Sequence, residues 1–151
     1  MNIPASSIQR NDFSINCNGR LVDLNTPKIM GILNLTPDSF SDGGKFNNEK
    51  SALLHAEKLL KDGADFIDIG AQSTRPNAEY LSAEEEIRRI GNMISLIKKE
   101  FPEALISIDT FYADVVKFGY NEGMDVVNDI SGGYFDENLL PTVAETKLPY
   151  I

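Results

Sequence analysis

The sequence contains no tryptophan, one cysteine, and 14 basic residues against 23 acidic residues among its 151 positions. The net charge of −9 disfavours nucleic acids and anionic lipid as partners, because an acidic surface repels phosphate groups. The lone Cys17 cannot form an internal disulfide, and no apolar run reaches the roughly 18 residues that a membrane-spanning helix needs. The first residues also lack the basic and apolar regions of a secretory signal, so we expect a cytoplasmic protein.

The composition is otherwise that of a soluble globular domain, with 42% hydrophobic and 25% charged residues. Residues 13–17 and 20–24 predict two short strands joined at the pair Asn18-Gly19. Asn-Gly is the preferred pair for a type I′ hairpin turn, since both positions need a positive φ. Pro27 closes this segment, and we therefore predict an N-terminal hairpin segment, 1–27, followed by a second unit, 28–151.

In the second unit, short apolar runs alternate with stretches of helical periodicity. This alternation predicts βαβ units and hence a parallel sheet. Ser82 and Glu85 form a capping box at the start of one helix, and residues 148–151 resemble the opening of a fifth strand. The predicted strands are 29–33, 66–69, 105–108 and the run beginning at 126, and the predicted helices are 51–62, 82–100, 113–120 and 136–147.

Two α/β architectures fit this alternation. A doubly wound sheet of about five strands suits the length, whereas a complete (β/α)8 TIM barrel needs about 250 residues. The strand ends favour the barrel, because its active site is built from the carboxyl ends of several strands, and no glycine-rich dinucleotide-binding motif follows any run. Polar residues follow all four apolar runs, namely Asn34, the segment 72–75, Asp109 with Thr110, and Asn128 with Asp129.

A single Asp or Asn at a strand end is more often a helix cap or a turn residue than a catalytic one. Four such ends in succession favour a site, and Asp109 is the strongest single candidate. The connection from residue 36 to 46 is long for a βα loop, and its aspartates, its paired glycines and Phe40 suit a lid over a ligand.

Four sequence motifs resemble dihydropteroate synthases, a family of pterin-binding TIM barrels. The motifs are MGILNLTPDSFSDGG at 30–44, STRP at 73–76, ISIDT at 106–110 and NDI at 128–130, in the order and at the spacing of that family. The resemblance covers roughly residues 12–151 and ends after the fourth βα unit. It implies the hairpin, about four βα units and the start of strand five of a (β/α)8 barrel.

The resemblance also implies a reaction, the condensation of 6-hydroxymethyl-7,8-dihydropterin pyrophosphate with 4-aminobenzoate in folate biosynthesis. By position, Asp109 and Asn128 would bind the pterin ring, and Thr74 would bind the pyrophosphate. Asn34 would face the pyrophosphate and its Mg²⁺, a cation that prefers oxygen ligands. A full-length member would be a homodimer.

The resemblance also implies roles for residues in the two loops that follow the first two strands of the barrel. Phe40 and Pro76 would form walls of the aminobenzoate pocket, and Asp38 and Arg75 would order the closed loops during catalysis. Position 72 departs from the family, which often has an acid there, so the role of Gln72 stays open.

Later strands of the family supply a further pterin-binding acid, a lysine, and basic groups for the pyrophosphate, none of which can be placed here. The chain alone is therefore expected to be inactive. Two alternatives remain: a pterin-binding barrel of the methyltetrahydrofolate methyltransferase type, and a non-catalytic half-barrel whose open strand edges invite association. Phe40 and the STRP motif favour the synthase, because they serve aminobenzoate and pyrophosphate.

Overall fold

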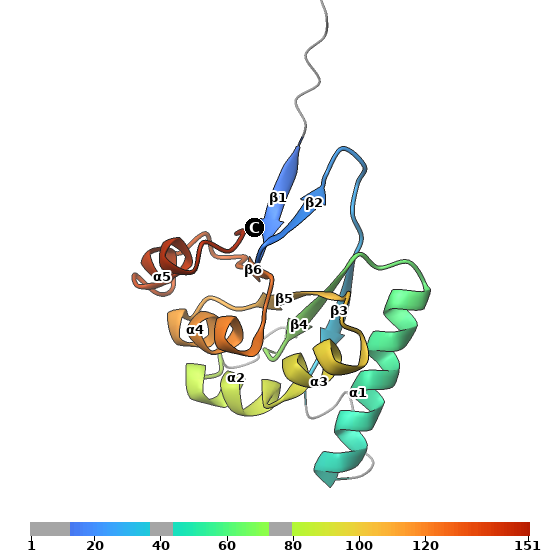
Figure 1. Ribbon diagram of the computed structural model, residues 1–151. Helices are drawn as coiled ribbons and strands as arrows, with labels where there is room; N and C mark the ends of the chain where they lie inside the picture. The colour runs from blue at the N-terminus through green and yellow to red at the C-terminus, as the bar shows by residue number, and fades with distance from the viewer. Residues whose placement is uncertain (1–12, 37–43, 73–79) are drawn as a thin grey trace, which may run out of the picture.

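The computed structural model describes residues 13–36, 44–72 and 80–151, which form a parallel sheet with helices packed against it (Figure 1). The sheet has the order β3-β4-β5-β6, so each strand lies beside its neighbour in the sequence, as in a barrel. Its strands are β3 (Met30–Asn34), β4 (Phe66–Gly70), β5 (Leu105–Asp109) and β6 (Val126–Asn128). The helices are α1 (Gly44–Lys61), α2 (Ala83–Ile90), α3 (Met93–Glu100), α4 (Ala113–Glu122) and α5 (Leu139–Thr146).

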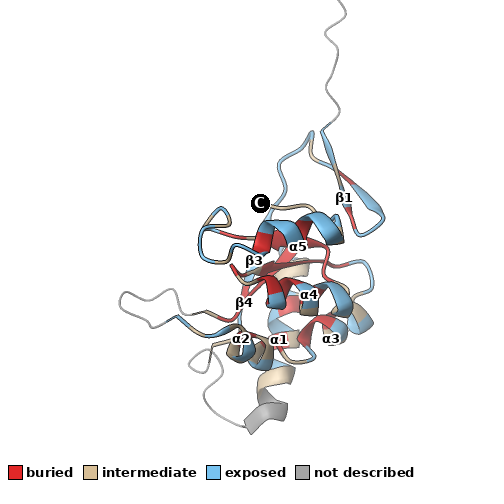
Figure 2. Ribbon diagram, turned by 90° about the vertical axis from the view of Figure 1, so that its left-hand side faces the viewer, coloured by how far each residue is buried: buried red, intermediate tan, exposed pale blue. Residues whose placement is uncertain are grey.

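The two faces of the sheet differ because side chains alternate along each strand. One set of strand residues packs with the helices in the main core, and Figure 2 shows buried residues on the strands and on the helices around them. This set is Leu33, Ile67, Ile69, Ile106, Ile108 and Val127. The opposite set forms what we call the inner face, which the barrel would enclose: Met30, Ile32, Asn34, Phe66, Asp68, Gly70, Leu105, Ser107, Asp109, Val126 and Asn128.

The predicted hairpin is confirmed as β1 (Ser14–Cys17) paired antiparallel with β2 (Arg20–Asp23). Asn18 and Gly19 both have positive φ, 50° and 90°, as a type I′ turn requires. The Asn18-Gly19 pair therefore sets the register of the two strands.

The hairpin covers the inner face at the amino ends of the strands. Cys17 and Val22 form a small buried cluster with Phe66, Leu105 and Val126. Burial raises the pKa of the Cys17 thiol to about 11, and the nearby charge of Asp125 adds to this effect. Apolar packing thus closes the inner face at the amino ends of the strands. The polar side chains of the inner face lie toward the carboxyl ends.

Two predicted helix boundaries were wrong. The helix predicted over 82–100 is divided into α2 and α3, because Gly91 leaves the helical conformation with a φ of 52°. Half of the predicted capping box is present, since Ser82 Oγ accepts from Glu85 N at 3.4 Å, whereas the Glu85 carboxylate accepts from Arg88 and Arg89. Helix α1 begins at Gly44 rather than at 51. The start was missed because residues 44–50 are mostly polar and show no apolar periodicity.

The last helix was predicted to begin at Asp136, and this boundary was also wrong, because α5 begins at Leu139. The residue before α5 is Asn138, whereas Asp136 Oδ2 accepts from the backbone N–H of Ala113, in the first turn of α4, at 2.7 Å. Residues 149–151 pair with β6 in parallel through Val127 and Tyr150, in agreement with the predicted start of a fifth strand.

Candidate active site

The strand-end residues predicted from the sequence lie in one row across the sheet. Asn34 is the register partner of Gly70, Gly70 of Asp109, and Asp109 of Asn128. A side chain at Gly70 would lie 3.1 Å from Asn34 Oδ1, so the absence of one makes room for the Asn34 amide. The sheet therefore brings Asn34, Asp109 and Asn128 to a single edge on the inner face.

Five other predicted site residues lie outside the described part of the chain. They are Asp38 and Phe40 in one connection, and Thr74, Arg75 and Pro76 in the other. Their roles stay predictions. The residues on either side of the undescribed segment 73–79 are described, and two of them, Gln72 and Leu81, form several of the hydrogen bonds near the site.

Asp109 is half-buried at the end of β5 in an acidic environment. Burial raises the pKa of its carboxyl above the usual range, and the charges of Asp68 and Asp129 raise it further. In the described residues no basic side chain forms an ion pair with Asp109. Such a carboxylate suits a ligand that offers N–H donors and disfavours an anion.

Asp68, which the sequence analysis missed, lies in the middle of β4 with only 7% of its surface exposed. Its Oδ2 accepts from Asn128 Nδ2 at 3.0 Å, across the sheet. Its Oδ1 and the Oγ of its register partner Ser107 are buried with no hydrogen-bond partner in the described ranges. The sequence did contain an indication of this residue, because a carboxylate interrupts the apolar run 66–69.

Glu86 on α2 joins the ends of two strand-to-helix connections. It is fully buried, and its Oε1 accepts from Gln72 Nε2 at 2.5 Å while its Oε2 accepts from Thr110 Oγ1 at 2.8 Å. Burial raises the pKa of this carboxyl, although the hydrogen bonds from Thr110 and Gln72 oppose the shift. Glu86 thus links the residue next to Asp109 to the segment after β4.

The structure gives a role to Gln72, whose departure from the family was unexplained. Its Oε1 accepts from Leu81 N at 3.0 Å, so the side chain connects both ends of the segment 73–79. The Leu81 carbonyl also accepts from the hydroxyl of Tyr112 at 2.7 Å. An amide at position 72 can donate to Glu86, whereas an acid there would place two carboxylates together.

Aromatic rings join the three connections that surround the strand ends. Phe111, after β5, lies 5.5 Å from Tyr80 and 4.8 Å from Phe135, measured between ring centroids. Tyr80 follows β4 and Phe135 follows β6 in the chain. Ring packing at these distances is favourable, so the rim of the site is held together.

Asp129, next to Asn128, has a structural role. Its carboxylate accepts from Ser131 N, Gly133 N and Tyr150 Oη, each at 2.7 Å. Burial alone would raise the pKa of Asp129, but these hydrogen bonds together lower it. Burial and the hydrogen bond to Asp129 raise the pKa of the Tyr150 hydroxyl to about 12. At this strand end the turn-residue interpretation is the correct one.

A protein-built metal centre is not visible among the described residues, which contain no group of three or more His, Cys, Asp or Glu side chains placed to hold a metal. Asn34 offers one amide oxygen, which is compatible with Mg²⁺ only where phosphate oxygens and water supply the other ligands. No helix in the described ranges is long and apolar enough to cross a membrane.

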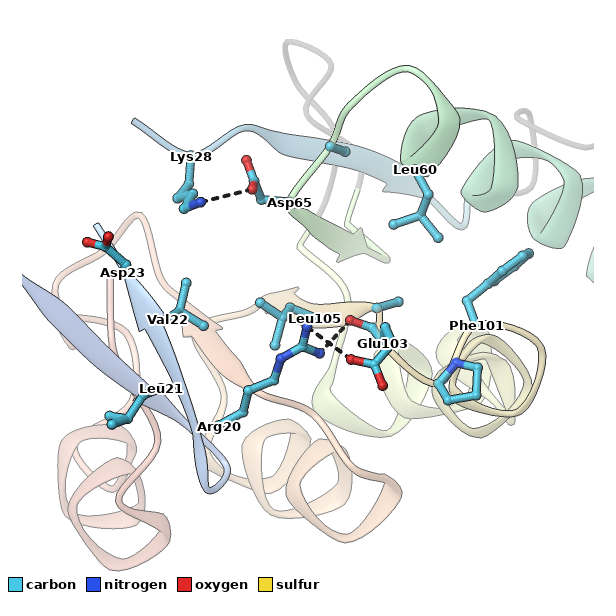
Figure 3. A pocket seen from close by; sticks show the side chains of 13 residues that line it. Arg20, Leu21, Val22, Asp23, Lys28, Leu60, Asp65, Phe101, Glu103 and Leu105 are labelled. Atoms are coloured by element: carbon cyan, nitrogen blue, oxygen red, sulfur yellow. Dashed lines mark hydrogen bonds and ion pairs between the residues drawn. The ribbon is translucent and has the colours of Figure 1, made fainter. Parts of the chain in front are cut away.

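A cavity of about 630 Å³ lies at the opposite, amino ends of the strands, between the hairpin and the ends of α1 and α3 (Figure 3). Arg20 pairs with Glu103 and Lys28 with Asp65, both at 3.2 Å, and Asp23 accepts from Asn25. Every charged side chain that lines it therefore has a partner within the protein. We attribute this cavity to the docking of the hairpin and place the candidate site at the carboxyl ends.

Comparison with known proteins gave consistent results. A family model described as pterin binding enzyme matches residues 30–151. Dihydropteroate synthase from Streptococcus pyogenes serotype M18 is 42% identical over 133 residues, which are 88% of this chain and 50% of that protein. The mitochondrial bifunctional folate synthesis protein of Arabidopsis thaliana is 46% identical over 84% of this chain and 23% of its own length.

Solved structures of dihydropteroate synthases share the fold of this chain. The dihydropteroate synthase of Xanthomonas albilineans with 4-aminobenzoic acid superimposes with a TM-score of 0.82 at 36% identity, covering 91% of this chain and 50% of that one. A Yersinia pestis dihydropteroate synthase in complex with a sulfonamide drug gives a TM-score of 0.79 at 40% identity over the same shares. The chain spans about half the length of the dihydropteroate synthases that it matches.

Proposed function

The chain belongs to the pterin-binding enzyme family, and on that premise we propose that it supplies the pterin-binding part of a dihydropteroate synthase. The observation that carries this proposal is the register pair Asp109 and Asn128 on adjacent strands of the inner face. A pterin ring presents a guanidine-like pair of N–H donors, which a carboxylate accepts in a bidentate manner. It also presents mixed donor and acceptor edges, which an amide matches.

In the proposed reaction, the amine nitrogen of 4-aminobenzoate forms a bond to the methylene carbon of the pterin pyrophosphate. The carbon–oxygen bond to the pyrophosphate breaks, pyrophosphate leaves with the electron pair, and the nitrogen loses a proton. The reaction requires little acid–base chemistry. Stabilising the departing charge and excluding water from the methylene are the main tasks.

The loop residues have the proposed roles that these tasks require. Phe40 and Pro76 form walls for 4-aminobenzoate, Asp38 and Arg75 order the closed loops, and Thr74 binds the pyrophosphate. Among the relatives, a structure with 4-aminobenzoic acid and a structure with a sulfonamide drug support a pocket of this kind.

The pyrophosphate requires positive charge that the described inner face does not supply. We therefore propose that Mg²⁺, with Asn34 among its ligands, and basic groups from the other half of the barrel hold the leaving group. The proposal includes a homodimer of the full-length barrel, a cytoplasmic location, and the division of this chain into a hairpin segment, 1–27, and a half-barrel, 28–151.

One experiment tests the proposal. The 151-residue chain, and a barrel completed by fusing it to the other half of the S. pyogenes relative, are each incubated with the pterin pyrophosphate, Mg²⁺ and 4-aminobenzoate. We expect 7,8-dihydropteroate and pyrophosphate from the completed barrel and neither from the chain alone. A folded but inactive completed barrel would refute the synthase assignment. Turnover by the chain alone would refute the claim that essential groups lie elsewhere.

A further inference from the structure

The hydrogen bond between Asp68 and Asn128 determines which way the Asn128 amide faces. A carboxylate only accepts hydrogen bonds, so the group that lies 3.0 Å from Asp68 Oδ2 must be the NH2 of the amide. The Oδ1 of Asn128 and its second N–H are then directed elsewhere. We propose that Asp68 is a positioning residue, which fixes the donor and acceptor that Asn128 presents to the pterin ring.

This inference rests on the proposed function and adds a residue to it. An amide flipped by 180° has almost the same shape but exchanges its donor and its acceptor. Against a mixed pterin edge, the flipped amide would set donor against donor and acceptor against acceptor. Asn128 therefore needs a neighbour that accepts only, and Asp68 is such a neighbour.

The position of Asp68 supports a role in the site over a role in packing. In the same row of the inner face, β3 carries Ile32 and β6 carries Val126, and the register partner on β5 is Ser107. An apolar side chain at position 68 would continue the row without burying a charge. The carboxylate instead keeps Oδ1 buried without a hydrogen-bond partner in the described part of the chain, which lowers stability. A residue retained at such a cost points to function.

A double-mutant cycle tests the proposal, because a residue that acts only through Asn128 loses its effect once Asn128 is removed. The completed barrel and its variants Asp68→Ala, Asn128→Ala and the double variant are titrated with 6-hydroxymethyl-7,8-dihydropterin pyrophosphate, and the dissociation constants are compared. We expect each single variant to bind about tenfold more weakly, since one good hydrogen bond is lost. The double variant is expected to bind no more weakly than Asn128→Ala.

A conservative variant, Asp68→Asn, separates positioning from the loss of charge. Its Oδ1 can still accept from Asn128, so we expect it to bind within about threefold of the unmodified barrel. Asp68→Asn and Asp68→Ala remove the same charge from the neighbourhood of Asp109, so their difference reports the hydrogen bond.

The matched control is Asp125→Ala. Asp125 is equally buried, but it lies at the amino end of β6 and accepts from Lys98 Nζ at 2.5 Å and from Ile106 N at 2.7 Å. This variant is expected to unfold at lower urea concentration with an unchanged dissociation constant in its folded form. A comparable loss of pterin affinity in Asp125→Ala would mean that the Asp68 effect is general destabilisation, and it would overturn the proposal.

Two further outcomes would overturn the positioning role. Additive losses in the double variant would show that Asp68 acts independently of Asn128. An Asp68→Asn variant as weak as Asp68→Ala would show that the negative charge itself, or a direct contact with the ligand, is what matters. Failure of the unmodified completed barrel to bind the pterin would instead refute the proposed function, so the two failures are distinguishable.

Discussion

Replacement of Glu86 by glutamine should change how the stability of this chain depends on pH. Glu86 is fully buried, and burial raises the pKa of its carboxyl above the ordinary value of 4.5. As the pH falls, the folded chain therefore takes up this proton before the unfolded chain does. The corresponding stabilisation is complete below pH 4.5 and is lost as the pH rises through the pKa of the folded state.

The size of the effect follows from the contacts of Glu86. In the Glu86→Gln variant, the new amide can accept from Gln72 through its oxygen and donate to Thr110, whose hydroxyl is both donor and acceptor. Glu86→Gln should therefore stay folded, whereas Glu86→Ala would remove the acceptor of both hydrogen bonds and cost about 2–6 kcal/mol in total. Relative to Glu86→Gln, the unmodified chain should lose stability as the pH rises, by at most about 1.4 kcal/mol per pH unit.

Urea unfolding followed by circular dichroism between pH 4 and pH 7 measures this difference directly. Glu85→Gln, the neighbour on the same helix, is the matched control, because hydrogen bonds from Arg88 and Arg89 lower the pKa of Glu85 to about 2. Its contribution is present above pH 4.5 and is lost only as the pH falls toward 2, so this variant should differ from the unmodified chain by a constant amount from pH 5 to pH 7. A difference for Glu86→Gln that is likewise constant, or that grows with pH in favour of the unmodified chain, would refute the reasoning.

Three further predictions concern other parts of the chain. Asp109→Ala in the completed barrel should weaken pterin binding by about 2–4 kcal/mol in a titration, since a charged hydrogen-bond partner is removed, and unchanged affinity would mean that the pocket is misplaced. Gly119→Ala should lower the free energy of unfolding by about 1–3 kcal/mol, because the new Cβ would lie 2.5 Å from Ile108 Cδ1, and a more stable variant would contradict this packing. Cys17, with its pKa raised to about 11 by burial and by the charge of Asp125, should react with a thiol reagent at pH 8 only as fast as the chain unfolds, and rapid labelling of the folded chain would contradict its burial.

Much of the sheet and part of the site could be predicted because they depend on local patterns. Asn18-Gly19 specified the hairpin turn through positive φ at both positions, and apolar runs separated by helical periods predicted the parallel order. Asn34, Asp109 and Asn128 could be placed together because carboxyl ends of parallel strands share one edge of the sheet.

The residues that could not be predicted depend on contacts between distant parts of the chain. The bonds from Glu86 to Gln72 and to Thr110 bridge 14 and 24 positions, and the Asp68 bond to Asn128 bridges 60. No helical or strand period encodes such pairs. The acidic start of α2 made Glu86 look like one more surface residue of a capped helix, although the structure buries it completely.

The charge on the inner face bears on how a site of this kind must be organised. Asp68 and Asp109 together favour a heterocycle with N–H donors, but the same carboxylates repel a pyrophosphate at short range. In the proposed function, the ring and the pyrophosphate would therefore be held at different places along the strand ends, with the ring beside Asp109 and Asn128 and the pyrophosphate on the side of β3. Asn34 is exposed at the end of β3, in the same row as Asp109 but two strands away, and the proposed Mg²⁺ and basic groups would act on this side without neutralising Asp109. In the proposed function, this separation across the sheet would allow one acidic face to bind an anionic substrate.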